Sequence, residues 1–268
     1  MRREFAVVGM MLILYACSTA PITGRRQLML VGPEQENALG VEAYSQVLRK
    51  EPITHDPRAT EPVRRIVSRL AAVADRQDFR WEVNVIKHDK TANAFVLPGG
   101  KIAVYTGIFP MAQTEAGLAI ILGHEVGHAI ARHGGERMSQ GLLAQLGGTA
   151  LAVAVQSSPQ ANMIMAAYGL GAQVGLLLPY SRLHESEADR IGLVLAAKAG
   201  YDPRVAVDVW KRMAALPGRR PPEFLSTHPN PETRIVDIEG FLPQAMKQFR
   251  PHSDSGETPL PAPETLGR

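Results

Sequence analysis

The chain has 268 residues, of which 45% are hydrophobic, and a formal net charge of +3. The apolar content excludes a wholly disordered protein, and the length allows one hydrophobic core with a small satellite lobe. Because the net charge is small and the basic residues form no stripe with interleaved aromatics, we expect no nucleic-acid partner.

The N-terminal segment has the layout of a secretory signal peptide. Two arginines follow Met1, and residues 6–16 form an almost uninterrupted apolar run. That run is too short to span a bilayer comfortably, so we predict that residues 1–16 are a signal peptide.

The single cysteine, Cys17, excludes an internal disulfide and stands directly after the apolar run. Leu14-Tyr15-Ala16-Cys17 resembles a bacterial lipobox, in which the cysteine is lipidated and becomes the new N-terminus. We therefore predict that residues 17–33 are a tether lipidated at Cys17, which would hold the protein at a membrane surface. Ser18 favours the outer membrane if the source is Gram-negative. The alternative is an ordinary signal peptide or an uncleaved anchor, with Cys17 present by chance.

Apolar periodicity predicts a mixture of helices and strands after the tether. The expected elements are helices over 34–50 and 62–74, a strand over 81–85, and strands over 93–97 and 101–105 joined by a tight turn at 98–100. The strand at 102–105 could pair with an extended substrate through an open edge. The alternative is that this strand lies inside the sheet.

Two apolar segments follow. Residues 116–131 are apolar almost all round, which predicts a buried central helix. No charged residue then occurs between Arg137 and Arg182, and the segment is interrupted at 157–159. Each of its two arms is shorter than the roughly 20 residues that a membrane span needs. We predict a buried helical hairpin there, and the alternative is a mobile or membrane-dipping lid.

The end of the chain differs in composition from the rest. After residue 249 it is rich in Pro and Ser and shows no periodicity. We therefore place the folded domain at residues 34–249 and expect residues 250–268 to form a disordered tail.

The sequence His124-Glu125-Val126-Gly127-His128 lies within the expected central helix. His124 and His128 are four residues apart, so both imidazoles project from one helix face and can share one Zn²⁺. Glu125 is rotated by about 100° from His124, which places its carboxylate beside the open position of the metal. There it can take a proton from zinc-activated water and pass it to the leaving amine. The pattern therefore favours a zinc peptidase.

A catalytic zinc usually has three protein ligands. His133 is a candidate for the third, but the metzincin spacing requires a glycine and a histidine where this chain has Ala131 and Gly134. A carboxylate from a second helix is the remaining choice.

The sequence Glu185-Ser186-Glu187-Ala188-Asp189 offers such a carboxylate. Glu185 and Asp189 are one turn apart on one face, so Glu185 can bind zinc while Asp189 accepts a hydrogen bond from a ligand histidine. Glu187 is rotated by about 200° from Glu185, which favours an ordinary surface carboxylate.

Four separated motifs resemble the HtpX and CAAX-prenyl-endopeptidase family of gluzincins. The resemblance covers roughly residues 21–245 and is strongest for the soluble lipoprotein branch, the BepA- and LoiP-like members. The motifs are HEVGH at 124–128, the Glu-x-x-x-Asp helix at 185–189, Thr227-His228-Pro229 followed by Arg234, and Pro21 to Leu28 together with Asn93-Ala94 and Pro98-Gly99-Gly100.

This resemblance implies an α+β, mostly helical fold: a zincin-like metallopeptidase domain with a short β-sheet beside two active-site helices. It implies that His124, His128 and Glu185 bind one Zn²⁺ per subunit and that Glu125 is the general base.

The resemblance also implies roles around the metal. His228 would stabilise the oxyanion, or occupy the fourth zinc position and hold the enzyme inactive. Arg234 would support the carboxylates of Glu185 and Asp189.

We therefore expect a zinc-dependent endopeptidase that cleaves misfolded or misassembled envelope proteins, anchored to the outer membrane and facing the periplasm. One alternative is a chaperone-like outer-membrane assembly factor with little or latent proteolysis. Another is a structural zinc protein without an open metal position.

Overall fold

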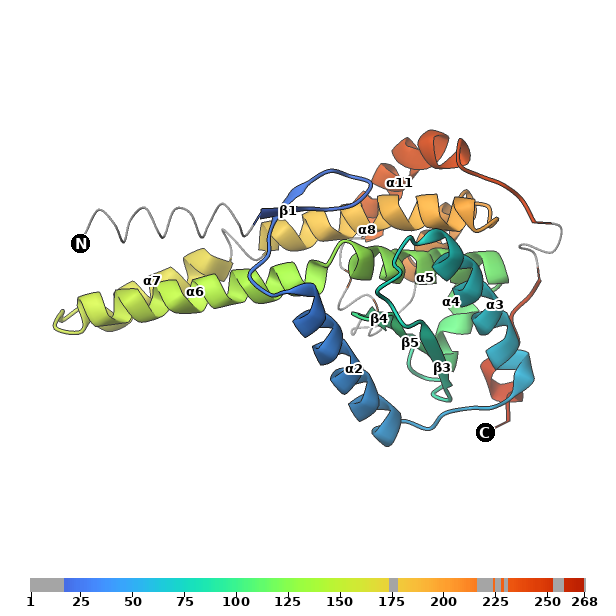
Figure 1. The fold of residues 1–268 in the computed structure, drawn as a ribbon, viewed down its shortest axis with the longest axis horizontal. Helices are drawn as coiled ribbons and strands as arrows, with labels where there is room; N and C mark the ends of the chain where they lie inside the picture. Colours follow the sequence, from blue (N-terminus) through green and yellow to red (C-terminus); the bar gives the residue numbers. More distant parts are fainter. Residues whose placement is uncertain are drawn as a thin grey trace.

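The computed structural model describes residues 17–173, 178–215, 224, 228, 231–252 and 258–267. The expected signal peptide at residues 1–16 lies outside these residues. The described part is mostly helical with two small sheets, which confirms the α+β expectation (Figure 1).

The elements follow one another along the chain as short strands, helices and a three-stranded sheet. The strands are β1 (Cys17–Thr19), β2 (Arg26–Leu28), β3 (Glu82–Ile86), β4 (Ala94–Leu97) and β5 (Lys101–Tyr105). The helices are α2 (Pro33–Lys50), α3 (Pro57–Val73), α4 (Phe109–Ala112), α5 (Glu115–Ile130), α6 (His133–Val155), α7 (Ala161–Ala172), α8 (Leu178–Lys198), α9 (Val205–Ala214) and α11 (Pro231–Met246), with short 3₁₀ turns η1 (Thr106–Ile108) and η3 (Pro263–Thr265).

The helix predicted over 62–74 begins earlier, at Pro57. The Asp56 side chain accepts a hydrogen bond from the Arg58 backbone N–H at 3.0 Å, and Pro57 occupies the first turn. An N-cap acid followed by proline is a strong helix start, and Pro62 is tolerated inside the helix.

The three-stranded sheet has the order β3-β5-β4, with β3 parallel and β4 antiparallel to β5. Gly99 and Gly100 make the turn between β4 and β5 with φ of +83° and +79°, a conformation that favours glycine. Strand β5 is central and every one of its residues is buried. The prediction that this strand offers an open edge to substrate is therefore wrong, because β3 and β4 occupy both of its edges.

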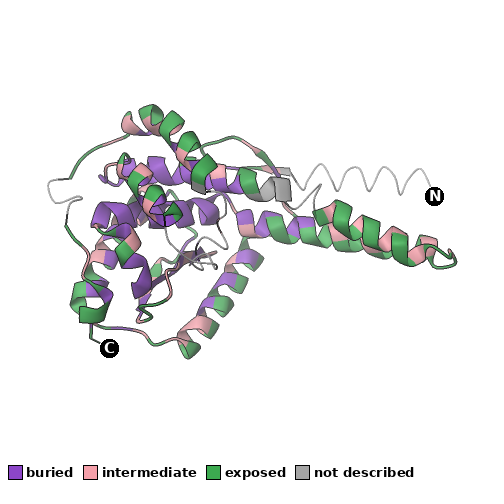
Figure 2. Cartoon of the chain, turned by 180° about the vertical axis from the view of Figure 1, so that it is seen from behind, coloured by how far each residue is buried: buried purple, intermediate pink, exposed green. Residues whose placement is uncertain are grey.

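Helix α5 is buried at every residue, as its all-round apolar sequence predicts, and it packs closely against α8 (Figure 2). Glycines permit this close approach. A Cβ added to Gly127 would lie 2.8 Å from the Ala188 carbonyl oxygen, and one added to Gly192 would lie 2.7 Å from the backbone nitrogen of His124. The absence of side chains at this seam brings the two motif-bearing helices together.

We expect Gly127→Ala to destabilise the fold by about 1–3 kcal/mol, because the added methyl group must push α8 away from α5. Urea denaturation measures the change. Gly141→Ala is the matched control, since a Cβ on Gly141 in α6 meets nothing within 4 Å. That substitution should leave the protein equally stable or slightly more stable. Equal midpoints for the two variants would show that the seam tolerates a methyl group.

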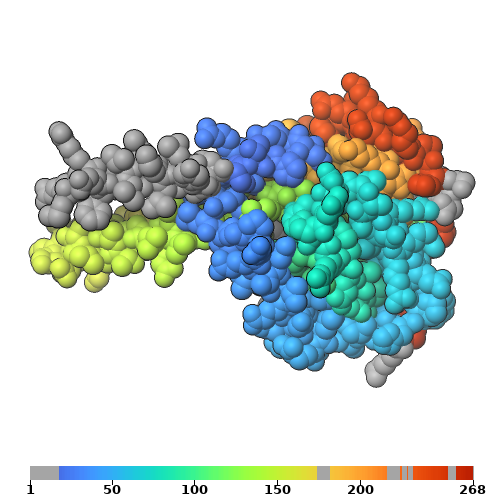
Figure 3. Space-filling model, in the orientation of Figure 1, coloured from blue at the N-terminus to red at the C-terminus, as the bar shows by residue number. Residues whose placement is uncertain are grey.

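Helices α6 and α7 form the hairpin predicted from the uncharged segment, but the prediction that it is buried is wrong. Figure 3 shows this hairpin as an arm that projects from the body. The start of α6 packs on the body through buried residues up to Gln140, whereas α7 has no buried residue. Large apolar side chains are exposed along the arm: Met138, Leu142, Leu143, Leu146, Val153, Met163 and Leu170. Among the described helices, α6, with 23 residues, is long and apolar enough to cross a membrane by length and composition.

The two ends of the described chain are more ordered than the sequence predicts. Within the expected tether, β1 and β2 form an antiparallel ladder. In the expected disordered tail, Leu266 is buried, Pro259 forms a β-bridge with Thr114, and the Gly267 N–H donates to Asp56 Oδ2 at 2.8 Å. The disorder prediction is wrong for residues 258–267, because a few isolated apolar anchors hold this segment without any periodicity.

Candidate active site

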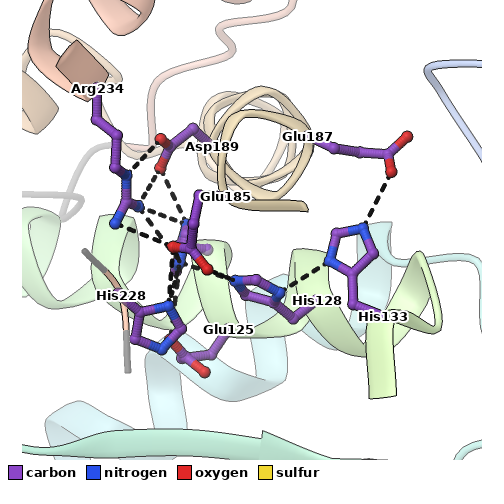
Figure 4. A network of polar contacts seen from close by, with 9 residues as sticks. Glu125, His128, His133, Glu185, Glu187, Asp189, His228 and Arg234 are labelled. Carbon is purple, nitrogen blue, oxygen red and sulfur yellow. Dashed lines mark hydrogen bonds and ion pairs between the residues drawn. The ribbon is translucent and has the colours of Figure 1, made fainter. Parts of the chain in front are cut away.

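The seam between α5 and α8 brings the predicted ligands to one place. One nitrogen or oxygen from each of His124, His128, Glu185 and His228 lies within 4.8 Å of every other. The first three residues are buried, and His228 is intermediate. Figure 4 shows His128 and Glu185 facing each other from the two helices, with His228 beside them.

The distances between these nitrogen and oxygen atoms are short enough for all of them to bind one ion. His124 Nε2 lies 3.0 Å from His128 Nε2. The Glu185 carboxylate oxygens lie 3.4 Å from His124 Nε2 and 3.4 Å from His128 Nε2. The geometry therefore matches the prediction that two imidazoles and a distant carboxylate converge.

The hydrogen bonds of the ring nitrogens show why the group needs a cation. His124 Nδ1 lies 2.9 Å from Asp189 Oδ1, so it carries the proton and donates to that carboxylate. With Nδ1 protonated, the neutral ring turns the Nε2 lone pair towards the Glu185 carboxylate. Electron pairs directed at one point repel unless a cation lies between them. Two imidazoles and one carboxylate are the donor set of a catalytic zinc.

The pKa values agree with a cation site. Burial lowers the pKa of His128 well below its usual value, which keeps this imidazole neutral as a metal ligand requires. Burial and Arg234 would also lower the pKa of His124, but Asp189 and Glu185 outweigh them and raise it to about 9. The direction of this shift shows that the surroundings of His124 favour a positive charge at this place.

Glu125 lies beside this group, and one oxygen of its carboxylate makes no hydrogen bond. Its side chain is buried, and Oε1 has no partner with hydrogen-bond geometry among the described residues, although it lies 3.2 Å from His228 Nε2. Burial raises the pKa of the Glu125 carboxyl. A buried, unsatisfied carboxylate with a raised pKa is suited to accept a proton.

Arg234 and Asp189 support the ligands from behind. The Arg234 guanidinium donates from Nε and Nη2 to Asp189 at 2.8 Å and 2.6 Å, and its Nη1 lies 3.1 Å from Glu185 Oε2. Its charge also lies 3.6 Å from the centre of the Trp210 ring. Burial would raise the pKa of Asp189, but Arg234 outweighs burial and lowers it, so Asp189 remains a carboxylate.

His228 covers the group from a segment of which only a few residues are described. Its Nδ1 lies 2.9 Å from Glu185 Oε2 and 3.2 Å from His124 Nε2, and its side chain is 12% exposed. The neighbouring Thr227 and Pro229 of the sequence motif lie outside the described residues. The structure thus brings His228 into the ligand group, where it can either bind the metal or face a substrate.

The protein family of this chain follows from a match to a family profile. The profile described as Peptidase family M48 matches residues 57–241. The chain belongs to peptidase family M48. M48 peptidases are zinc-dependent, and the described His124, His128 and Glu185 could hold that metal. The family comparison confirms the expectation of a gluzincin metallopeptidase.

The curated relatives carry names of two kinds, mitochondrial metalloendopeptidase and beta-barrel assembly-enhancing protease. The chain is 39% identical over 232 residues to "Mitochondrial metalloendopeptidase OMA1" of Schizosaccharomyces pombe, covering 84% of this chain and 66% of the relative. It is 32% identical over 243 residues to "Metalloendopeptidase OMA1, mitochondrial" of Homo sapiens, covering 85% and 46%. It is 33% identical over 213 residues to "Putative beta-barrel assembly-enhancing protease" of Vibrio cholerae, covering 76% and 43%. The chain thus spans between about two fifths and two thirds of these M48 proteins.

The sequence did not predict a second buried polar cluster beside the M48 motif. Glu187, expected at the surface, is only 4% exposed and accepts hydrogen bonds from Arg25 Nε at 2.8 Å and from Thr23. Glu136 accepts from Arg25 Nη2 at 2.6 Å, and its Oε2 lies 2.9 Å from His184 Nε2. The rotation of Glu187 away from Glu185 was correct, but the face to which it turns is covered by residues 17–28, which contain β1 and β2 and are called the N-terminal hairpin below. The one sequence signal was Arg25, which belongs to the tether motif.

We expect this cluster to make the M48 domain acid-sensitive. Burial would raise the pKa of Glu136 and Glu187, but their hydrogen bonds outweigh it and lower both to about 2. Because these folded-state pKa values lie below the ordinary value, the carboxylates stabilise the fold above about pH 4.5 and lose this contribution as the pH falls towards 2. The loss at pH 3 should be on the order of 1–2 kcal/mol per carboxylate.

Urea midpoints at pH 5 and pH 3 measure this sensitivity. The variant Glu187→Gln has one titrating group fewer and should lose less stability between the two pH values than the wild type. An identical loss in both proteins would show that Glu187 does not contribute.

Proposed function

We propose that this protein is a zinc-dependent endopeptidase of the cell envelope that cleaves misfolded or misassembled proteins. One observation carries the hydrolytic part of the proposal: buried Glu125, with an unsatisfied carboxylate oxygen, lies beside two imidazoles and a carboxylate that converge on one point. This arrangement suits proton transfer next to a metal, and a purely structural zinc site would not need it.

Each residue of the site has a part in the proposed reaction. Zinc held by His124, His128 and Glu185 would polarise the scissile carbonyl and acidify water. Glu125 takes the proton of the attacking water and delivers it to the leaving amine nitrogen. His228, whose Nε2 lies 3.2 Å from Glu125 Oε1, can turn to donate a hydrogen bond to the oxyanion that forms on the substrate carbonyl.

Strand β4 is the place where an extended substrate fits. It pairs with β5 on one side only in the described sheet, and it packs against α5, the helix that carries His124 and His128. A peptide added along the free side of β4 would satisfy backbone groups by β-augmentation. Such binding depends on the backbone and not on particular side chains, which suits unfolded segments of many proteins.

The envelope location rests on the N-terminal sequence and on the projecting arm. An apolar run precedes Cys17, and the α6–α7 hairpin carries exposed leucines and methionines on a segment without charge. We infer that a lipid on Cys17 and this arm hold the enzyme at the outer membrane, facing the periplasm. The beta-barrel assembly-enhancing proteases among its relatives support a bacterial envelope role.

Lipid anchoring predicts that Cys17→Ser weakens membrane attachment, so that a larger share of the variant than of the wild type is found in the soluble fraction, while the α6–α7 arm can retain the rest. Metabolic labelling with a fatty acid should mark the wild type and not the variant, because the thiol is the site of attachment. Label that persists in the variant would contradict lipidation at Cys17.

Chelation tests the proteolytic proposal directly. The purified protein should cleave an unfolded outer-membrane protein, lose this activity with a chelator and regain it when one equivalent of zinc is added. Activity that survives complete removal of zinc would contradict the proposal.

The position of His228 favours a second candidate function. Because its Nδ1 lies 2.9 Å from Glu185 and 3.2 Å from His124, His228 can occupy the metal position that a water molecule needs. The protein would then assist outer-membrane assembly as a chaperone-like factor with latent proteolysis. In that case His228→Ala should cleave substrate faster than the wild type, and Glu125→Gln should still complement a strain with an envelope defect.

A further inference from the structure

The ligand His128 is the first member of a row of buried polar groups that leads away from the metal position. Its Nδ1 lies 2.8 Å from His133 Nδ1, and His133 Nε2 lies 3.0 Å from Glu187 Oε2. His133 is fully buried and Glu187 nearly so. Figure 4 shows His128, His133 and Glu187 following one another from α5 through the start of α6 to α8.

The proton positions in this row have one consistent arrangement. If His128 presents the Nε2 lone pair to a metal, its Nδ1 carries the proton and donates to His133 Nδ1. His133 must then carry its own proton on Nε2, where it donates to the Glu187 carboxylate. The negative charge of Glu187 thus fixes the tautomer of His133, and through it the tautomer and ring orientation of His128.

The N-terminal hairpin completes this row. Arg25 donates from Nε to Glu187 at 2.8 Å and from Nη2 to Glu136 at 2.6 Å, so one guanidinium joins α8 to α6. Thr23 donates to the other oxygen of Glu187. Gln27 donates to the Ala131 carbonyl oxygen at 2.6 Å, directly after α5. A segment far from His128 in sequence therefore holds Glu187 in place, and Glu187 in turn holds His133 against His128.

We propose that His133 and Glu187 are positioning residues for the zinc ligand His128, and that the N-terminal hairpin, residues 17–28, is part of the metal centre because Arg25 holds Glu187. This inference rests on the proposed function, since it takes His128 as a zinc ligand. It assigns a role to a segment that begins at Cys17, the proposed lipidation site, and contributes no metal ligand itself. When the hairpin contacts Glu187 and Glu136 through Arg25, the protein binds zinc more tightly.

Zinc affinity measured by competition with a chromophoric chelator tests the proposal without any proteolysis. We expect Glu187→Gln to weaken zinc binding about tenfold or more, the usual effect of removing an outer-shell partner. Arg25→Ala should weaken it in the same direction by a smaller factor. Arg26→Ala is the matched control, because Arg26 is the next residue, has the same charge and is exposed, and its zinc affinity should equal that of the wild type.

A merely structural role is separated by two further measurements. A structural defect lowers the melting temperature of the metal-free and zinc-bound forms equally, whereas loss of positioning reduces the rise in melting temperature that zinc produces. The visible spectrum of the cobalt-substituted protein should change in Glu187→Gln and stay constant in Arg26→Ala. If Arg25→Ala fails to fold, Arg25→Lys carries the test, because lysine keeps the charge but loses the fork that joins two carboxylates.

The outcomes distinguish this proposal from the one on which it rests. Zinc affinities of Glu187→Gln and of the folded Arg25 variant within twofold of the wild type would overturn the positioning role. A wild-type protein that binds zinc but cleaves nothing would overturn the proposed peptidase and leave the positioning role standing.

Discussion

Glu125→Gln should lower kcat for an unfolded protein substrate by a factor of about 10²–10⁴. The amide has nearly the shape of the carboxylate, so the metal ligands stay in place, but it cannot accept a proton from water. The Glu125 carboxyl is buried, its pKa is raised by that burial, and its Oε1 has no hydrogen-bond partner among the described residues. Replacing it therefore removes a proton acceptor without breaking a hydrogen bond of Oε1, and the neighbouring His228 Nε2, 3.2 Å away, can face the amide oxygen instead.

The measurement needs zinc content and activity on the same preparation. Zinc stoichiometry and melting temperature should match the wild type, while cleavage followed by mass spectrometry should disappear or fall to a trace. Glu232→Gln on α11 is the control, because this glutamate is exposed, and the variant should retain full activity. Equal cleavage by Glu125→Gln and the wild type would exclude Glu125 as the general base.

The spacing of residues within each helix was sufficient to predict which side chains share a face, and the structure brings His124, His128 and Glu185 into one group that could hold a metal ion. Residues four apart on a helix share a face, and this holds for His124 and His128 and again for Glu185 and Asp189. We predicted that the two helices lie side by side because a catalytic zinc needs a third protein ligand, and a carboxylate on a second helix can supply it. The two helices can lie this close because Gly127 and Gly192 have no side chains at their contact. These glycines can be recognised in the sequence once the two helices are known to touch.

What the sequence did not predict depends on contacts between distant segments. Glu187 was placed on the far side of α8 from the metal, which is correct, but only the structure shows that the N-terminal hairpin covers that side. In the same way, the apolar content of α6 and α7 predicted helices without indicating whether protein, membrane or water surrounds them. The sequence predicted strand β5, but its central place follows from β3 pairing with it in parallel from a different part of the chain.

The site also shows how buried charges limit what can be changed. Asp189, Glu185 and Glu125 are three buried acids beside one buried arginine, so the protein alone leaves an excess of negative charge there. A zinc ion between the ligands would reduce this excess. Metal binding and folding are therefore coupled, and a substitution that removes positive charge should affect both.

Arg234→Ala should produce the largest loss of stability among single substitutions at this site. Arg234 is only 3% exposed, holds both oxygens of Asp189 and lies 3.1 Å from Glu185 Oε2. Removing it deprives two buried carboxylates of one cationic partner each, and deleting one partner of a buried pair costs about 3–5 kcal/mol. Because Asp189 would then be free to turn away from His124, zinc affinity should fall as well.

Urea denaturation of the zinc-bound protein measures the loss of stability, and chelator competition measures the loss of zinc affinity. Arg190→Ala is the matched control, since Arg190 is the next residue after Asp189 on α8 but is exposed, and that variant should remain within about 0.5 kcal/mol of the wild type. Arg234→Lys should fall between the two, because it restores the charge but not the paired hydrogen bonds to Asp189. If Arg234→Ala were as stable as Arg190→Ala, the carboxylates of α8 would have to be held by the metal alone, and the guanidinium would have no structural part in the site.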